Sequence, residues 1–126
     1  PCRGKTFPEG SSLLFFTDYA ENFQDLNVPV QAIVWMGGGY FNSRSDFPLK
    51  TGSPAELASA TFGEPIDTIS FSKRGRTLLI QKHEENVYSM VEDAILVGFI
   101  LGEMPEDYRK EQWRVILSVY GQLTPR

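Results

Sequence analysis

Residues 95–101 read Ile-Leu-Val-Gly-Phe-Ile-Leu, a run without a polar side chain. Its length suits a strand, and its β-branched residues together with Gly98 favour a strand over a helix. A strand whose two faces are both apolar is typical of the middle of a sheet that is covered on both sides. The run therefore predicts the central, doubly buried strand of the fold.

Further runs in the chain have the length and the apolar content of strands. They comprise residues 13–17, 28–36, 66–71, 77–82 and 87–91. The runs 66–71 and 77–82 flank the loop sequence Ser-Lys-Arg-Gly-Arg at residues 72–76, and a glycine-containing loop between two such runs predicts a hairpin. Residues 87–91 predict either a further short strand or a continuation of the strand before it.

A short helix is expected between the two groups of strands. Residues 53–56 read Ser-Pro-Ala-Glu, the pattern of a capping box with proline at the first helical position. The pattern predicts Ser53 as the N-cap of a helix over residues 54–62. Gly63 is a suitable residue to end it.

A second helix is expected to begin at Pro105, which is followed by two acidic residues that complement the helix dipole. Its apolar residues follow the spacing i, i+3, i+4, i+7 of a single stripe: Trp113, Ile116, Leu117 and Tyr120. We expect this stripe to pack on the sheet above Phe99 and Leu101 or their neighbours. Gly121 is expected to end the helix.

The order of these elements indicates the fold class. Consecutive strands without intervening helices favour an antiparallel sheet, so we predict an α+β fold in which helices flank the sheet as an α-β-α sandwich. A length of 126 residues suits one domain, which we assign to residues 13–126. Residues 1–12 are rich in Pro, Gly, Ser and charge, and we expect an irregular N-terminal arm there.

Charge and composition limit the kinds of function. Sixteen acidic residues against twelve basic ones give a net charge of -4, which disfavours a general nucleic-acid-binding surface. The one cysteine excludes an intrachain disulfide framework and a multi-cysteine zinc site. No apolar run is long enough to cross a bilayer as a helix, so no direct membrane insertion is expected. The chain begins at Pro1, so either an initiator methionine was trimmed or a longer precursor was cut, and the second would fit an imported or secreted protein.

Three patterns could carry chemistry, and for each we favour a plainer interpretation. Residues 37–39 are all glycine, but Tyr40 follows where a phosphate loop needs a Lys-Ser/Thr pair, which indicates a flexible strand exit. His83 precedes two glutamates, but neighbours along a strand point to opposite faces, so a solvated polar strand end is expected rather than a metal site or a proton sensor. Cys2, with His83 as its base, lies in the predicted arm, where a nucleophile is poorly positioned. We therefore predict no enzyme activity, no metal and no cofactor.

Two groups of residues are candidates for binding a protein partner. The basic residues of the predicted hairpin loop are either a solvated turn or a docking knob for an acidic surface: Lys73, Arg74 and Arg76. The aromatic residues of the loop after the second strand either contact a partner or fold back on the core: Tyr40, Phe41 and Phe47.

The order of short motifs resembles the PsbP family of photosystem II extrinsic proteins. The similar segments are Leu-Phe-Phe-Thr-Asp at 14–18, Asn-Val-Pro-Val at 27–30, Ser-Asp-Phe at 45–47, Gly-Ser-Pro-Ala-Glu-Leu at 52–57, the strand at 93–101, Pro-Glu-Asp-Tyr at 105–108 and Ser-Val-Tyr at 118–120. The family's opening Tyr-x-Phe-x-Tyr-Pro-x-x-Trp strand is not visible in residues 1–12, and residues 48–51 interrupt its Asp-Phe-Gly-Ser-Pro run.

The resemblance implies a PsbP-like sandwich and a function without catalysis. It implies an extrinsic or accessory subunit in the chloroplast thylakoid lumen, docked on a larger photosynthetic complex at the membrane. Because one fold serves many functions, an alternative stays open. The alternative is a small acidic bacterial binding protein, such as an immunity protein or a chaperone for secretion effectors, whose charge complements a basic client.

Overall fold

The computed structural model describes residues 2–6, 12–17, 30–37, 50–73 and 75–123. Within these ranges, seven strands form one sheet in the order β1-β2-β3-β7-β6-β5-β4, and every neighbouring pair is antiparallel. The strands are β1 Cys2–Thr6, β2 Ser12–Thr17, β3 Val30–Met36, β4 Asp67–Lys73, β5 Arg76–Glu84, β6 Val87–Glu92 and β7 Ile95–Gly102. The helices are α2 Glu56–Phe62 and α3 Glu111–Leu123. Together these elements define an α+β fold.

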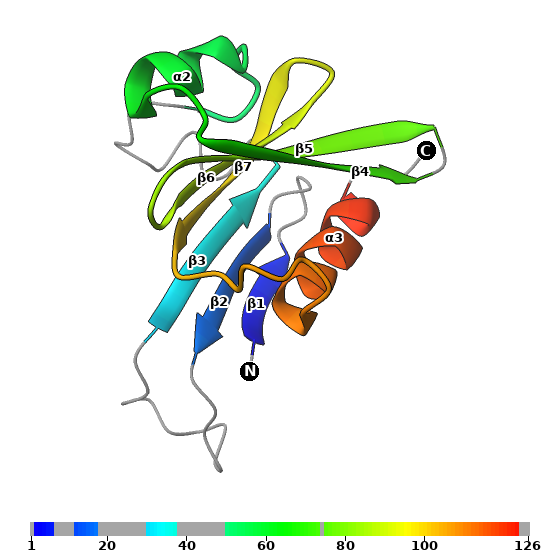
Figure 1. Cartoon of the computed structure of the whole chain (residues 1–126). Coiled ribbons are helices and arrows are strands. Elements are labelled where there is room, and N and C mark those ends of the chain that lie inside the picture. Colours follow the sequence, from blue (N-terminus) through cyan, green and yellow to red (C-terminus); the bar gives the residue numbers. More distant parts are fainter. Residues whose placement is uncertain (1, 7–11, 18–29, 38–49, 74, 124–126) are drawn as a thin grey trace.

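Two meanders make up the sheet, β1-β2-β3 and β4-β5-β6-β7, and the pairing of β3 with β7 joins them (Figure 1). In this pairing Val34 lies opposite Ile100, and both side chains are fully buried. β7 is therefore the central strand, as residues 95–101 predict, and the predicted strands from residue 66 onward are confirmed as β4, β5 and β6.

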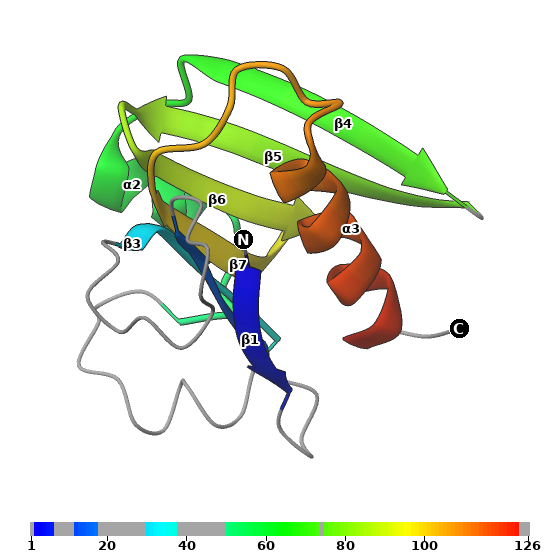
Figure 2. The same ribbon diagram turned by 90° about the horizontal axis from the view of Figure 1, so that it is seen from below.

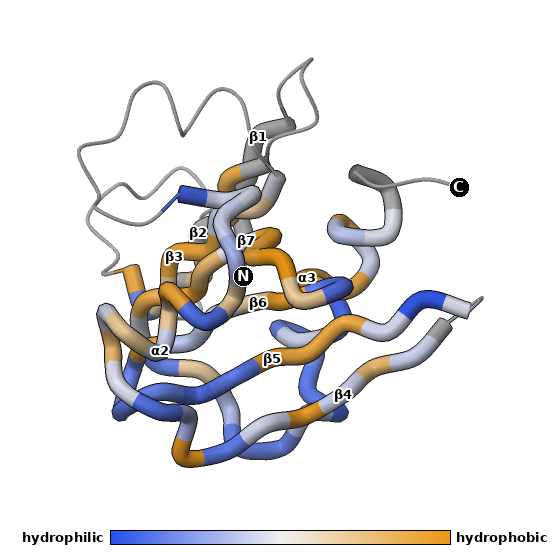
Figure 3. The backbone as a smooth tube through the Cα atoms, turned by 90° about the horizontal axis from the view of Figure 1, so that it is seen from above, coloured by the Kyte–Doolittle hydropathy of each residue, from blue (hydrophilic) through white to orange (hydrophobic). Residues whose placement is uncertain are grey.

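The face of the sheet beneath α3 carries the larger hydrophobic cluster. Alternate residues of the central strands, among them Val34, Met90 and Ile100, pack there against Trp113 and Ile116 of α3. Figure 3 shows the hydrophobic residues gathered along the central strands. The predicted stripe of α3 is confirmed, because Trp113, Ile116 and Tyr120 are buried and Leu117 is partly buried.

The opposite face of the sheet packs against α2. Ala58 of α2 joins Val91, Leu96 and Phe99 in the second cluster, with Trp35 beside them. Phe99 therefore lies under α2 rather than under α3, because side chains alternate along a strand and Ile100 takes the position facing α3. Figure 2 shows the two helices on different sides of the sheet.

Glycine allows β3 and β7 to approach closely. A Cβ atom on Gly102 would lie 2.1 Å from the backbone oxygen of Gln31, and one on Gly98 would lie 2.7 Å from that of Trp35. Gly102 also has a φ of +127°, which side chains of L-residues rarely adopt. Both glycines are therefore required where the two meanders meet.

The prediction of an irregular N-terminal arm at residues 1–12 is wrong for Cys2–Thr6. These residues form β1, which pairs antiparallel with β2, with Cys2 opposite Phe16 and Thr6 opposite Ser12. The polar and glycine-containing composition hid this strand, since an edge strand is stabilised by backbone pairing with its neighbour and needs no apolar run of its own.

The predicted capping box at residues 53–56 is also wrong. Ser53 and Pro54 instead continue the pairing with β7: Pro54 forms a bridge with Ile95, and the backbone oxygen of Ser53 accepts from the backbone N–H of Leu96 at 2.8 Å. The helix begins at Glu56, its N-cap residue Ala55 makes no side-chain cap, and Gly63 follows its last residue as predicted. Tertiary pairing has overridden the local signal.

The last helix begins later than Pro105 and passes its predicted end. Residues 106–110 form bends and a turn, and the indole Nε1 of Trp113 donates to the backbone oxygen of Pro105 at 2.8 Å. The helix starts at Glu111 and continues through Gly121 to Leu123. Gly121 carries no positive φ among the described glycines, so it is an ordinary helical residue here.

Candidate functional site

The β4–β5 hairpin holds the basic residues that the sequence marks for docking. Lys73 ends β4, Arg76 begins β5, and the two lie opposite each other across the turn. Gly75 supplies the turn with a φ of +78°, which suits glycine. The side chain of Lys73 and all of Arg74 lie outside the described residues, as do Tyr40, Phe41 and Phe47.

Arg76 forms an ion pair with Glu92 of β6. Its terminal nitrogen lies 2.7 Å from Oε1 of Glu92, and its Nε donates to the same oxygen at 3.1 Å. Their side chains are only 14% and 13% exposed, so the pair is screened from most of the solvent. Hydrogen bonding to the carboxylate raises the pKa of the Arg76 guanidinium. Arg76 is therefore a partly buried cation whose orientation is set by Glu92.

Tyr120 of α3 completes this cluster. Its hydroxyl donates to Oε1 of Glu92, and the Arg76 guanidinium carbon lies 5.1 Å from the centre of its ring. Burial, and then the hydrogen bond to Glu92, raise the pKa of Tyr120 from 10.0 to about 12. Arg76, Glu92 and Tyr120, called here the brace, connect the turn end of the hairpin to β6 and to α3.

The brace gives Arg76 an acidic partner that its neighbours in the sequence do not show. Between Ser70 and Ile80 the sequence has no acidic residue. Glu92 is 16 residues away in the chain, but β6 pairs with β5 so that Glu92 lies opposite Leu78, two residues beyond Arg76. Tyr120 was recognised only as part of an apolar stripe. The sequence offers one signal for this pair: Arg76 directly precedes one predicted strand, at residues 77–82, and Glu92 directly follows the next predicted strand, at residues 87–91.

His83 lies inside the protein, so the prediction of a solvated strand end is wrong. Its side chain is 4% exposed and its ring lies 5.6 Å from that of Phe62 in α2. Its Nδ1 lies 2.8 Å from the backbone oxygen of Gly63 and its Nε2 lies 2.7 Å from Oγ of Ser89. Because a carbonyl can only accept, Nδ1 carries a proton. The Ser89 hydroxyl lies between Nε2 of His83 and Oε1 of Gln81, to which it donates at 3.4 Å.

The Ser89–His83 pair has the arrangement of a nucleophile beside a general base. Ser89, however, is fully buried and His83 nearly so, and a buried hydroxyl cannot meet a substrate. The pair instead attaches the end of α2 to the sheet through Gly63. Ser89 could have been noticed in the sequence, because a polar residue within an apolar strand needs a hydrogen-bond partner.

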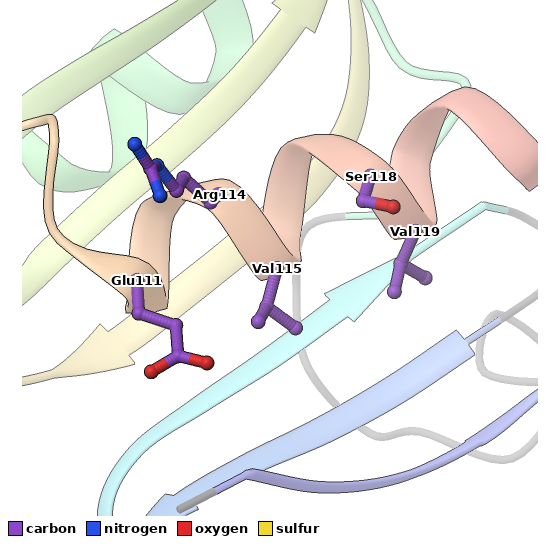
Figure 4. Close-up of a pocket in the computed structure, with 5 residues that line it drawn as sticks. All are labelled: Glu111, Arg114, Val115, Ser118 and Val119. Atoms are coloured by element: carbon purple, nitrogen blue, oxygen red, sulfur yellow. The ribbon is translucent and has the colours of Figure 1, made fainter.

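A shallow, open hollow of about 430 Å³ runs along α3 (Figure 4). Val115 and Val119 point the same way from the helix, while Arg114 projects from its other side. Glu111 and Ser118 also line the hollow. These residues do not converge on one point, so they form a surface rather than a reaction centre.

A metal site and a cysteine–histidine pair are two further kinds of site that the sequence raises. Among the described residues, no group of three or more His, Cys, Asp and Glu residues could hold a metal ion. Cys2 is described only as part of β1, so a pairing of its thiol with His83 lies outside what the structure describes. In the same part of the chain, neither helix has the length and apolar character needed to cross a bilayer.

Comparison with known proteins identifies no relative. No family model matches the chain, and no curated protein and no solved structure matches it significantly.

Proposed function

We propose that this protein is a non-enzymatic docking module that presents the end of its β4–β5 hairpin to an acidic surface on a larger protein complex. The observation that supports this is the brace. A hairpin held only by its own turn would lose much conformational freedom on binding, and that loss weakens association. Glu92 and Tyr120 hold the first residue of β5 in place beforehand, so less ordering remains to be done.

The charge of the loop supports the choice of an acidic partner. Lys73 is the last residue of β4, and Arg74 follows it in the sequence. Both are cationic, on a chain with a net charge of -4. Exposed charges act chiefly on the rate of encounter and on salt sensitivity. Arg76 contributes differently, because Glu92 already neutralises it and it serves to orient the loop.

The finer proposal is a PsbP-like protein, an extrinsic or accessory subunit in the thylakoid lumen. Its support is the order of short motifs in the sequence, together with an antiparallel sheet that carries one helix on each face. On this proposal the acidic surface belongs to a photosynthetic complex at the membrane. The aromatic residues Tyr40, Phe41 and Phe47 remain candidates for the same contact surface.

The experiment is binding of the purified chain to photosystem II membranes stripped of their extrinsic proteins. We expect saturable binding to the stripped membranes and weak binding to unstripped membranes, in which the docking surface is occupied. Protein-free vesicles made from the same lipids are the control. Equal binding to all three would overturn the photosynthetic assignment. Affinity purification from the native source would then identify the complex to which the hairpin docks.

A further inference from the structure

The outer edge of β4 is an unpaired strand edge. β4 is last in the sheet and pairs only with β5 among the described elements. Lys73 and Arg76 flank a two-residue turn, so they form a hydrogen-bonded pair, and every second pair along the ladder does the same. The residues between those pairs direct their backbone N–H and C=O groups away from β5: Thr68, Ser70 and Ser72.

These outward groups are accessible. Thr68, Ser70 and Ser72 are exposed, and within the described residues their backbone groups make no hydrogen bond to another element. The one contact is local, from the N–H of Thr68 to Oδ1 of Asp67 at 3.0 Å. In Figure 3, β4 lies at the rim of the sheet. Long open edges of this kind tend to pair with another strand.

The sequence of β4 complements itself when it is reversed. The strand reads Asp-Thr-Ile-Ser-Phe-Ser-Lys over Asp67–Lys73, with Ser70 at its centre. Two antiparallel copies centred on Ser70 would place Asp67 opposite the second copy's Lys73, a pair of opposite charge. Ile69 would lie opposite Phe71, an apolar pair, and Thr68 opposite Ser72, a hydroxyl pair. Cross-strand pairs of these kinds stabilise a sheet.

We propose that β4 pairs with β4 of a second copy of this chain about a two-fold axis at Ser70, so that one sheet continues through both copies. The same register aligns the outward groups of Ser70 with those of Ser70, and those of Thr68 with those of Ser72. It therefore forms about six backbone hydrogen bonds. A register shifted by two residues loses both the charge pairing and part of these bonds.

The β4–β4 contact breaks one existing hydrogen bond and buries little surface, so we expect the dimer to form reversibly. The N–H of Thr68 must exchange its bond with Asp67 for one to Ser72, which frees the carboxylate of Asp67 for Lys73. Interfaces made by one strand from each partner bury little surface and are typically weak. A two-fold contact is closed, so association stops at two copies. The proposal does not depend on docking at the hairpin loop.

Sedimentation over a range of concentrations tests the pairing. We expect the parent protein to pass from one copy to two as its concentration rises. Ser70→Pro removes the outward N–H of Ser70, and should weaken the dimer at least tenfold. Ser70→Ala keeps that N–H and should associate as the parent does. A parent that remains single at about 1 mM, an assembly larger than two copies, or a dimer that survives Ser70→Pro would each overturn the proposal.

Cysteine cross-linking tests the register in case Ser70→Pro disturbs the fold. In a Cys2→Ser background, Ser70→Cys should form an intermolecular disulfide, because hydrogen-bonded residues opposite each other lie about 5.5 Å apart at Cα, within disulfide range. Ser72→Cys is the matched control, since its own counterpart would lie about 13 Å away. Cross-linking at Ser70 alone supports the axis. Equal cross-linking at both positions, or at neither, rejects it and leaves the edge to a strand from another protein.

Discussion

Tyr120 and Arg76 both direct a hydrogen bond to the same oxygen of Glu92, although they come from the last helix and from the hairpin. One carboxylate thus connects three elements that are distant in the chain. A partly buried carboxylate with two donors is stabilised in its charged form, but each donor that is removed leaves part of its desolvation cost unmet. The brace is therefore expected to contribute both to stability and to the position of the hairpin.

Tyr120→Phe should destabilise the protein. The change removes the hydroxyl that donates to Glu92 and keeps the ring beneath Arg76. We expect a loss of about 1–2 kcal/mol in the free energy of unfolding, measured with urea at neutral pH. Tyr108→Phe is the matched control, since the hydroxyl of Tyr108 has no hydrogen-bond partner among the described residues, and it should cost less than about 0.5 kcal/mol. Equal losses in the two variants would contradict the brace.

The stability of the protein should fall at alkaline pH. The pKa of Tyr120 is raised from 10.0 to about 12, so between these values the unfolded chain ionises this tyrosine and the folded chain does not. The contribution is fully present below about pH 10 and is lost as the pH rises towards 12, by up to about 2–3 kcal/mol. Burial raises the pKa of Tyr88 and Tyr108 in the same direction.

Urea unfolding at pH 8, 10 and 11.5 measures this loss. The parent should lose more stability over that range than Tyr120→Phe does, because the variant lacks the hydroxyl whose pKa is raised to about 12. If the two proteins lose the same amount, Tyr120 is not the tyrosine whose ionisation opposes folding.

Ser89→Ala should destabilise the protein by about 1–3 kcal/mol. The change leaves Nε2 of His83 without its hydrogen-bond partner in a buried position, and an unsatisfied buried polar group carries its full desolvation cost. Ser72→Ala is the control, because Ser72 is exposed and, among the described residues, its hydroxyl contacts that of Thr77 alone, at 3.0 Å. A double-mutant cycle with His83→Ala should show coupling between the two buried residues. Additive losses would indicate that the Ser89–His83 contact contributes nothing.

Ile116→Ala should cost about 2–5 kcal/mol, because Ile116 is fully buried between α3 and the sheet. Leu57→Ala is the comparison, since Leu57 is a 45% exposed residue of α2 and should cost less than about 1 kcal/mol. Chemical denaturation measures both. A loss below about 0.5 kcal/mol at Ile116 would show that α3 does not pack as described.

The sequence predicts elements whose pattern is local and strong. The apolar run at residues 95–101 and the apolar stripe of α3 have patterns that predict both the type of element and its buried side. Prediction from the sequence fails where residues distant in the chain determine the local structure. β1 is stabilised by backbone pairing with β2, although its own composition is not that of a strand. Ser53 and Pro54 pair with β7 instead of beginning a helix.

The candidate site also has a part that the sequence predicts and a part that it does not. The basic character of the hairpin loop is visible in the sequence, but the brace is not, because the register between β5 and β6 brings Glu92 to Arg76 and the packing of α3 adds Tyr120. His83 was misplaced for a related reason. Its neighbours in the chain are charged, and the two that follow it, Glu84 and Glu85, are exposed, while its hydrogen-bond partners are Gly63 and Ser89.

The salt dependence of binding by the variant Lys73→Ser/Arg74→Ser tests the docking of the hairpin most directly. Lys110→Ser/Arg114→Ser is the matched control, since it removes the same charge from two exposed positions at α3. With stripped photosystem II membranes, or with the complex recovered by affinity purification, we expect the hairpin variant to bind at least tenfold more weakly at low ionic strength. The deficit should shrink as salt rises, because salt screens exposed charges. The control should bind like the parent. If both variants weaken equally, or if the hairpin variant binds as tightly as the parent at low salt, the hairpin is not the docking surface.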